Sequence, residues 1–125
     1  MRVDSSMYRF RTRFSFEAKR LLGKLHPVGI YLGEDGMGCF LSGAYARDDD
    51  QAGMLGYVQS ETPRRWADRI AAELRKDPSR YSMPEHGQFS SVEIVDGLDH
   101  TYRSSHERLS VGRPVSIFHT LLPLC

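Results

Sequence analysis

The chain has 125 residues, of which 40% are hydrophobic and 26% are charged. These proportions are typical of a globular protein and exclude a collagen-like or intrinsically disordered chain. Seventeen lysine and arginine residues against sixteen aspartate and glutamate residues give a net charge of +1, so no overall field favours DNA, RNA or an anionic membrane. We expect a single α+β domain over residues 1–125, with residues 1–6 as a flexible tail.

The cysteine content and the hydropathy exclude further classes. The sequence has two cysteines, Cys39 and Cys125, which are too few and too far apart for a disulfide framework or a zinc ribbon. The first ten residues lack the features of a secretion signal, and no apolar run approaches the roughly 20 residues that span a membrane. We expect a cytoplasmic protein with no metal, no cofactor and no membrane contact.

Two regular elements are predicted near the N-terminus. From Tyr8 to Phe16, aromatic residues alternate with arginines, which predicts a half-buried strand. Alanine and leucine then recur at helical spacing from Ala18 to Leu25, before Pro27. We expect a helix of about two turns there.

A β-hairpin is predicted next, over residues 28–46. Apolar residues alternate from Val28 to Leu32, residues 33–36 form a turn, and a second strand runs from Cys39. Residues 47–53 are polar and are expected to form an exposed loop. A short strand is expected from Met54.

The strongest local signal is that of an amphipathic helix over residues 62–77. Thr62 is a good N-cap, and Pro63 suits the first helical position. Apolar residues then recur at helical spacing, at Trp66, Ala67, Ile70, Ala71 and Leu74. Asp77, which precedes Pro78, ends the helix.

The C-terminal part is predicted to be rich in strands. Residues 89–96 and 115–122 have strand-like composition, and residues 99–110 fit either a helix or a strand, with the strand favoured. With the short strand at Met54 set aside, the order of elements matches the split βαβ, ferredoxin-like fold. We therefore expect an antiparallel sheet with two helices on one face, plus a C-terminal β-hairpin.

Residues 8–25, YRFRTRFSFEAKRLLGKL, resemble the opening of toxins of the RelE/ParE family. In that family a basic, aromatic strand leads into a helix through a similar junction. The family continues with a second helix, whereas this sequence continues with the predicted hairpin of residues 28–46. The resemblance is limited to residues 8–25 and assigns no functional residue.

An anion-binding site is predicted at the start of the long helix. Arg64 and Arg65 lie in its first turn, where the helix dipole and the unpaired N–H groups favour negative charge. A phosphate or carboxylate ligand would balance these two cations, since helix N-termini bind anions. Alternatively, the protein's own acids supply the charge, from Glu61, Asp68 or residues 48–50.

A nucleic-acid patch is a second candidate site. Arg9, Arg11 and Arg13 share one face of the first predicted strand, about 6.5 Å apart, which is close to the phosphate spacing of a nucleic-acid strand. RNA is therefore a candidate partner, and no feature points specifically to DNA. The alternative is an ordinary solvated face of a strand.

The third candidate site is formed by histidines. If residues 112–113 form a tight turn, His106 faces His119 across a hairpin. Two histidines beside Arg103 could act as the acid, the base and the charge stabiliser of a metal-independent ribonuclease. The alternative is a packed core histidine, since apolar residues share the strand face of His119.

Two functions follow from these sites. The first is a non-catalytic module that binds a protein partner or a small anionic ligand, through the helix end at Arg64 and Arg65 or through the C-terminal hairpin. The second is a toxin-type, metal-independent ribonuclease or phosphodiesterase that uses His106, His119 and Arg103. The binding module is favoured, and the oligomeric state, including a homo-oligomer, stays open.

Overall fold

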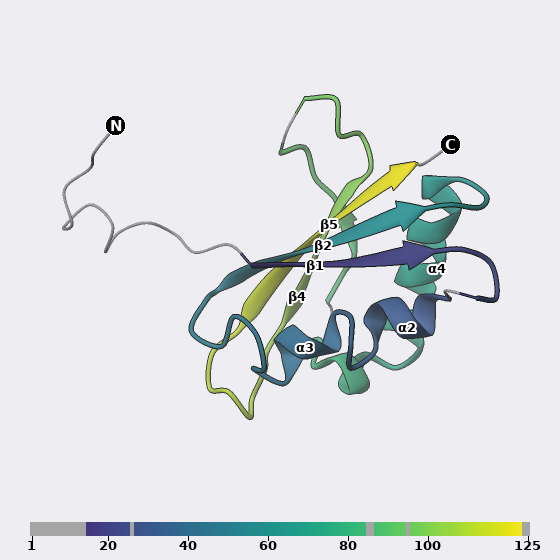
Figure 1. Ribbon diagram of the computed structural model, residues 1–125. Coiled ribbons are helices and arrows are strands. Elements are labelled where there is room, and N and C mark those ends of the chain that lie inside the picture. The colour runs from purple at the N-terminus through teal and green to yellow at the C-terminus, as the bar shows by residue number, and fades with distance from the viewer. Residues whose placement is uncertain (1–14, 26, 85–86, 95, 124–125) are drawn as a thin grey trace.

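A computed structural model describes residues 15–25, 27–84, 87–94 and 96–123 of the chain (Figure 1). In chain order, its elements are β1 (Ser15–Leu21), α2 (Val28–Leu32), α3 (Gly38–Leu41), β2 (Gln51–Val58), α4 (Pro63–Lys76), the 3-10 helix η1 (Pro78–Tyr81), β3 (Ser90–Ser91), β4 (Thr101–His106) and β5 (Val115–Pro123).

The strands form one mixed sheet in the order β1-β2-β5-β4-β3. The strands β1, β2 and β5 are parallel, whereas β4 is antiparallel to both β5 and β3. The predicted antiparallel, ferredoxin-like sheet with two helices on one face is therefore wrong. The helices α2 and α3 connect β1 to β2, and α4 begins the long connection from β2 to β5. Strands joined by such crossovers run parallel, whereas hairpins make them antiparallel.

Residues 18–21 belong to β1 and not to the helix predicted over residues 18–25. Burial alternates along β1; Leu21 is fully buried, while Leu25 is 74% exposed. An isolated helix of two turns is marginal in water, whereas β1 gains a full ladder with β2. Of the strand predicted over residues 8–16, all but Ser15 and Phe16 lies outside the described residues.

Residues 28–46 contain two short helices, so the predicted hairpin is also wrong. Each helix buries two neighbouring residues, Tyr31 with Leu32 and Cys39 with Phe40. Neighbours on a strand point to opposite faces, whereas a helix that lies on the sheet can bury two neighbours on one side, as these two helices do. The turn between the helices is tight, because Met37 N donates to the Tyr31 carbonyl at 2.8 Å and a Cβ at Gly36 would lie 2.0 Å from that oxygen.

The helix α4 confirms the prediction for residues 62–77. Thr62 Oγ1 accepts a hydrogen bond from Arg65 N at 3.2 Å, as an N-cap does, and Pro63 is the first helical residue. Trp66, Ala67, Ile70 and Leu74 are buried. Trp66 also donates from its indole Nε1 to the Ser60 carbonyl at 2.7 Å.

The predicted strands of the C-terminal half are confirmed more closely than those before Gln51. The strand β2 contains the segment predicted from Met54, although it begins within the expected loop of residues 47–53. The strand β5 covers the predicted residues 115–122, and residues 101–106 adopt the favoured strand alternative as β4. In the predicted strand of residues 89–96, the described strand is confined to Ser90–Ser91.

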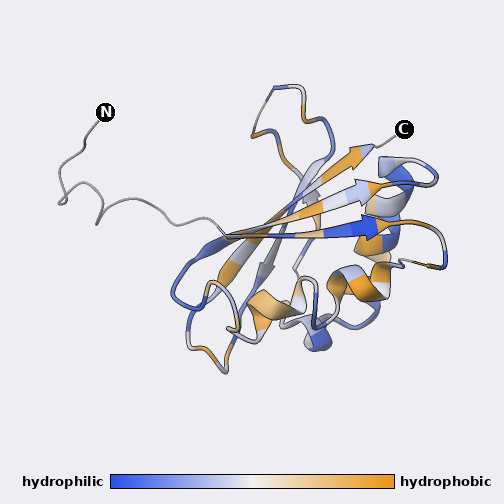
Figure 2. Ribbon diagram, viewed as in Figure 1, coloured by the Kyte–Doolittle hydropathy of each residue, from blue (hydrophilic) through white to orange (hydrophobic). Residues whose placement is uncertain are grey.

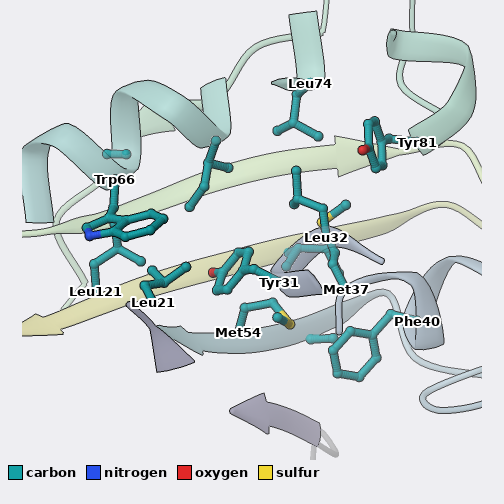
Figure 3. Packing of buried hydrophobic residues seen from close by; sticks show 14 of the residues in the cluster. Leu21, Tyr31, Leu32, Met37, Phe40, Met54, Trp66, Leu74, Tyr81 and Leu121 are labelled. Atoms are coloured by element: carbon teal, nitrogen blue, oxygen red, sulfur yellow. The ribbon is translucent and has the colours of Figure 1, made fainter. Parts of the chain in front are cut away.

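The core fills the space between one face of the sheet and the helices, which lie together on that side (Figure 1). Figure 3 shows Trp66 and Leu74 of α4 opposite Met54 and Leu121 of the strands. Figure 2 shows that α2 and α3 are largely hydrophobic. Both short helices are thus part of the core layer.

The opposite face of the sheet is called the outer face below. By the alternation of the strands, β1 places Ala18 and Arg20 on it, and β2 places Leu55 and Tyr57 there. The register of β5 and β4 adds Thr120, Leu122 and Arg103 to the same face.

Candidate functional site

The two predicted histidines belong to a continuous hydrogen-bonded chain inside the core. Tyr31 Oη lies 2.8 Å from His119 Nδ1, and Ser104 Oγ lies 2.8 Å from the Nε2 atoms of both His119 and His106. His106 Nδ1 lies 2.6 Å from the Tyr81 carbonyl oxygen, which ends the chain. The side chains of Tyr31, Ser104, His106 and His119 are buried.

The donor and acceptor of each hydrogen bond in this chain can be assigned from its last acceptor, the Tyr81 carbonyl, when both imidazoles are neutral. A carbonyl oxygen can only accept, so His106 Nδ1 carries the proton that it donates to Tyr81. His106 Nε2 then accepts the hydroxyl proton of Ser104, whose oxygen accepts from His119 Nε2. His119 Nδ1 accepts from the Tyr31 hydroxyl. With both imidazoles neutral, every donor of this chain has one acceptor, and the two histidines carry opposite tautomers.

The environment keeps both histidines in this neutral state. Burial lowers the pKa of His106 to about 4; its hydrogen bond to the Tyr81 carbonyl raises that pKa and the charge of Arg108 lowers it further. Burial also lowers the pKa of His119 to about 3, with a smaller contribution from His106. Burial raises the pKa of Tyr31 well above its ordinary value. This hydrogen-bonded chain of side chains is thus uncharged at neutral pH.

The structure brings His106 and His119 together only through Ser104, and it does not bring Arg103 to them. The predicted register is wrong: His106 pairs with Val115 and His119 with Tyr102, because residues 107–114 form a longer loop than the expected two-residue turn. Arg103 points to the outer face, where it donates to Ser116 Oγ at 3.1 Å. Because His106 and His119 are no more than 1% exposed, a substrate has no access to them in this conformation.

Arg108 lies in that loop and fixes its position, and sequence reasoning missed it. Its guanidinium is fully buried, and its five N–H donors bind five backbone carbonyl groups. The acceptors are the carbonyls of Phe40, Ala46, Arg47, Asp49 and Arg113, at 2.8 to 3.4 Å. Arg108 therefore ties the β4–β5 loop to the segment that follows α3. An arginine in a polar loop is usually exposed, so its sequence context offered no signal.

A solvent-accessible candidate site lies beside the first half of α4, and we call it the α4–β4 cleft. Its volume is about 320 Å³. It is lined by Arg64, Ala67, Asp68, Ala71, Phe89, Ser91, Asp99, His100 and Tyr102. The cleft thus combines an apolar wall with charged and hydrogen-bonding groups, which is the usual composition of a small-molecule site.

Aromatic contacts order one wall of the cleft. The rings of Phe89 and Tyr102 stack with centroids 4.9 Å apart and planes 11° apart. Phe89 also meets the ring of His119 edge-on at 5.0 Å, so it separates the cleft from the buried hydrogen-bonded chain. His100 Nδ1 lies 3.4 Å from Tyr102 Oη.

The two arginines predicted at the helix start have different surroundings. Arg64 lines the cleft, and its Nε lies 3.4 Å from Asp68 Oδ1. Arg65 is bound to Glu61 at 3.3 Å, and Arg69 binds the same carboxylate at 2.7 Å. The hydrogen bond from Arg69 is the main reason that the pKa of Glu61 is lowered. Of the predicted pair, Arg64 is therefore the one placed to meet a ligand in the cleft.

Three remaining predictions concern the arginine row, metal ligands and membrane spans. Arg9, Arg11 and Arg13 lie outside the described residues. Within the described segments, no group of three or more His, Cys, Asp and Glu side chains could hold a metal ion. Nor does any described helix have the length and apolar character needed to cross a bilayer.

Comparison of the sequence with protein-family models and with curated proteins finds no significant match, and comparison of the structure with solved structures finds none either. The resemblance of residues 8–25 to RelE/ParE toxins thus gains no support from a family model. The helix implied by that resemblance is replaced by the second half of β1.

Proposed function

We propose that this protein is a non-catalytic binding module for a small molecule with an anionic group. The ligand occupies the α4–β4 cleft, with its anion against Arg64. The observation that carries the proposal is that Arg64, His100 and Tyr102 converge on one cleft with an apolar wall. The sequence signal at Arg64 and the cleft are independent arguments for the same site.

The ion pair that Arg64 makes with Asp68 is weak enough to be exchanged. The two side chains are 76% and 70% exposed, and their atoms are 3.4 Å apart. Pairs with such exposure contribute at most about 1 kcal/mol, because water and salt screen them. A ligand anion in the cleft can therefore compete with Asp68 for the guanidinium.

The geometry does not favour the ribonuclease alternative. The hydrogen-bonding atoms of His106 and His119 are engaged inside the core, and Arg103 lies on the other face of the sheet. We propose no catalytic role for these three residues.

Thermal unfolding in sodium phosphate tests the binding proposal. A ligand that binds only the folded protein raises the melting temperature in a saturable way. We expect phosphate, compared with sodium chloride at equal ionic strength, to stabilise wild type and not Arg64→Ala. Arg65→Ala and the outer-face variant Arg20→Ala should keep the effect. If phosphate stabilises Arg64→Ala as much as wild type, or if neither phosphate nor a carboxylate ligand stabilises wild type, the proposal is overturned.

The outer face favours a second role, the binding of a protein partner. Parallel strands are usually covered on both faces, whereas α2, α3 and α4 lie together on one side of this sheet (Figure 1). Leu55, Tyr57 and Leu122 are half-buried neighbours on the outer face. Arg20 lies beside Tyr57, and Arg103 lies farther along the same face, opposite Phe118. Among the described residues of this face none is acidic. Such a face suits an acidic amphipathic helix of another protein.

Photo-crosslinking tests this second role. We would place p-benzoylphenylalanine at Tyr57, irradiate cells that naturally contain the protein and map the crosslinked peptide. We expect the crosslinked peptide to come from an acidic amphipathic helix of another protein, and Arg20→Glu to lower the yield of this crosslink. The same photo-residue at Lys76 should give no such product. The second role is rejected if the photo-residue crosslinks to residues 1–14 of the same chain or to a second copy of the protein, or if no crosslink forms.

A further inference from the structure

We propose that the ligand of the α4–β4 cleft is a free α-amino acid with an apolar side chain. This inference rests on the proposed binding function and identifies the chemical class of the ligand. The charges that share the cleft with Arg64 and the apolar wall of the cleft both favour this class of ligand.

The cleft contains more negative than positive charge. Among its described lining residues, Arg64 is the one permanent cation, whereas Asp68 and Asp99 are carboxylates. A ligand with only a negative charge displaces Asp68 from Arg64, so one ion pair replaces another. The displaced Asp68 and the nearby Asp99 then repel that ligand.

A zwitterion resolves this conflict. Its carboxylate binds Arg64, while its ammonium group binds Asp68 or Asp99, so two ion pairs form and one breaks. Arg64 Nε and Asp68 Oδ1 are 3.4 Å apart. In an α-amino acid the carboxylate and the ammonium group are attached to one carbon. The two charges of such a ligand can therefore lie side by side against this neighbouring pair.

The apolar wall accounts for the side chain of the ligand. Ala67 and Ala71 of α4 line the cleft together with the ring of Phe89. Phe89 is held on two sides, by its stack on Tyr102 and its edge contact with His119, so it presents a fixed surface. A volume of about 320 Å³ lies at the small end of the range for small-molecule pockets, which suits a single amino acid.

Matched ligands test the inference with the intact chain. We would titrate ¹⁵N-labelled protein with L-phenylalanine, with N-acetyl-L-phenylalanine, which lacks the cation, and with L-phenylalanine methyl ester, which lacks the anion. We expect saturable amide shifts at Ala67, Ala71 and Tyr102. Removal of either charge should weaken binding about fivefold, as the loss of one exposed ion pair does.

Charge-neutral variants at these exposed positions assign each contact. Arg64→Gln should remove the preference for phenylalanine over its methyl ester. The double variant Asp68→Asn, Asp99→Asn should remove the preference over the N-acetyl compound. Arg20→Ala, on the outer face, should change neither preference, and an unchanged amide spectrum outside the cleft shows that each variant is folded.

The outcomes separate this inference from the proposed function. If N-acetyl-L-phenylalanine or inorganic phosphate binds the cleft as tightly as phenylalanine, the cleft is an anion site and the zwitterion inference is overturned. If phenylalanine, the N-acetyl compound and phosphate all leave the cleft amides unshifted, both proposals are overturned.

Discussion

His106 Nδ1 lies 2.6 Å from the carbonyl oxygen of Tyr81, and this one contact sets the proton positions along a buried chain that ends at Tyr31. The carbonyl only accepts, so His106 Nδ1 carries a proton, and because burial keeps both histidines neutral, every donor in the hydrogen-bonded chain has one acceptor. A proton added to either imidazole leaves a donor without an acceptor in the core, which is unfavourable. The stability of the fold is therefore linked to pH.

Stability should fall steeply as the pH drops below about 6.5. The pKa values of His106 and His119 are lowered to about 4 and about 3 in the folded protein, whereas an unfolded histidine titrates near 6.5. The unfolded state thus binds more protons between these values, so stability is complete above about pH 6.5 and is lost below it. Between these pKa values, protonation of each histidine should lower the free energy of unfolding by about 1.4 kcal/mol for each pH unit of acidification.

Urea unfolding at pH 7 and pH 5 measures this effect. Two histidines together should lower the free energy of unfolding by about 4 kcal/mol over this interval. His106→Gln should lose about half of the pH dependence, whereas His100→Gln, which lies outside the buried chain, should retain it. An equal pH dependence in wild type and His106→Gln would contradict the linkage.

Removal of the Ser104 hydroxyl should destabilise the fold by about 3 kcal/mol, because it leaves two buried polar groups unpaired. These groups are His106 Nε2, which loses its donor, and His119 Nε2–H, which loses its acceptor. The measurement is urea unfolding of Ser104→Ala. Ser105→Ala, one residue along on the outer face, is the matched control and should change stability by less than about 0.5 kcal/mol. A similar loss of stability in both variants would show that the Ser104 hydroxyl does not stabilise the core.

Arg108→Met should be strongly destabilising, by about 3 kcal/mol or more, because several backbone carbonyls lose a buried donor together. Arg113→Met removes an exposed hydrogen bond to the Asp48 carbonyl and should cost less than about 1 kcal/mol. Limited proteolysis gives a second readout, since cleavage of the Arg108 variant should concentrate at residues 42–50 and 107–113. If the two variants are equally stable, Arg108 does not hold these loops together.

The turn between α2 and α3 should not accept a side chain at Gly36. A Cβ there would lie 2.0 Å from the Tyr31 carbonyl oxygen, so Gly36→Ala should cost about 3 kcal/mol. At Gly29, within α2, no atom lies within 4 Å of an added Cβ. Gly29→Ala should therefore stabilise the protein by up to about 1 kcal/mol, through helix propensity. Thermal unfolding of the two variants should show melting temperatures that move in opposite directions.

Those parts of the structure that depend on local chemistry could be predicted from the sequence. The helix α4 was predicted because Thr62, Pro63 and the apolar repeat act within a few residues of one another. The strand β5 was predicted from its alternation and composition. Arg64 was identified as a candidate because a cation at a helix start is a local conflict.

The tertiary structure alone decided the topology and the composition of each site. Short apolar repeats at residues 18–25 and 28–32 suit a strand or a helix equally, and partners distant in the sequence, such as β2 for β1, made the choice. Likewise, Ser104, Arg108 and the residues that join Arg64 in the cleft have no local signal, because the groups they contact are far away in the chain. Propensity and capping act over single turns, whereas sheet pairing and buried hydrogen bonds depend on the whole fold.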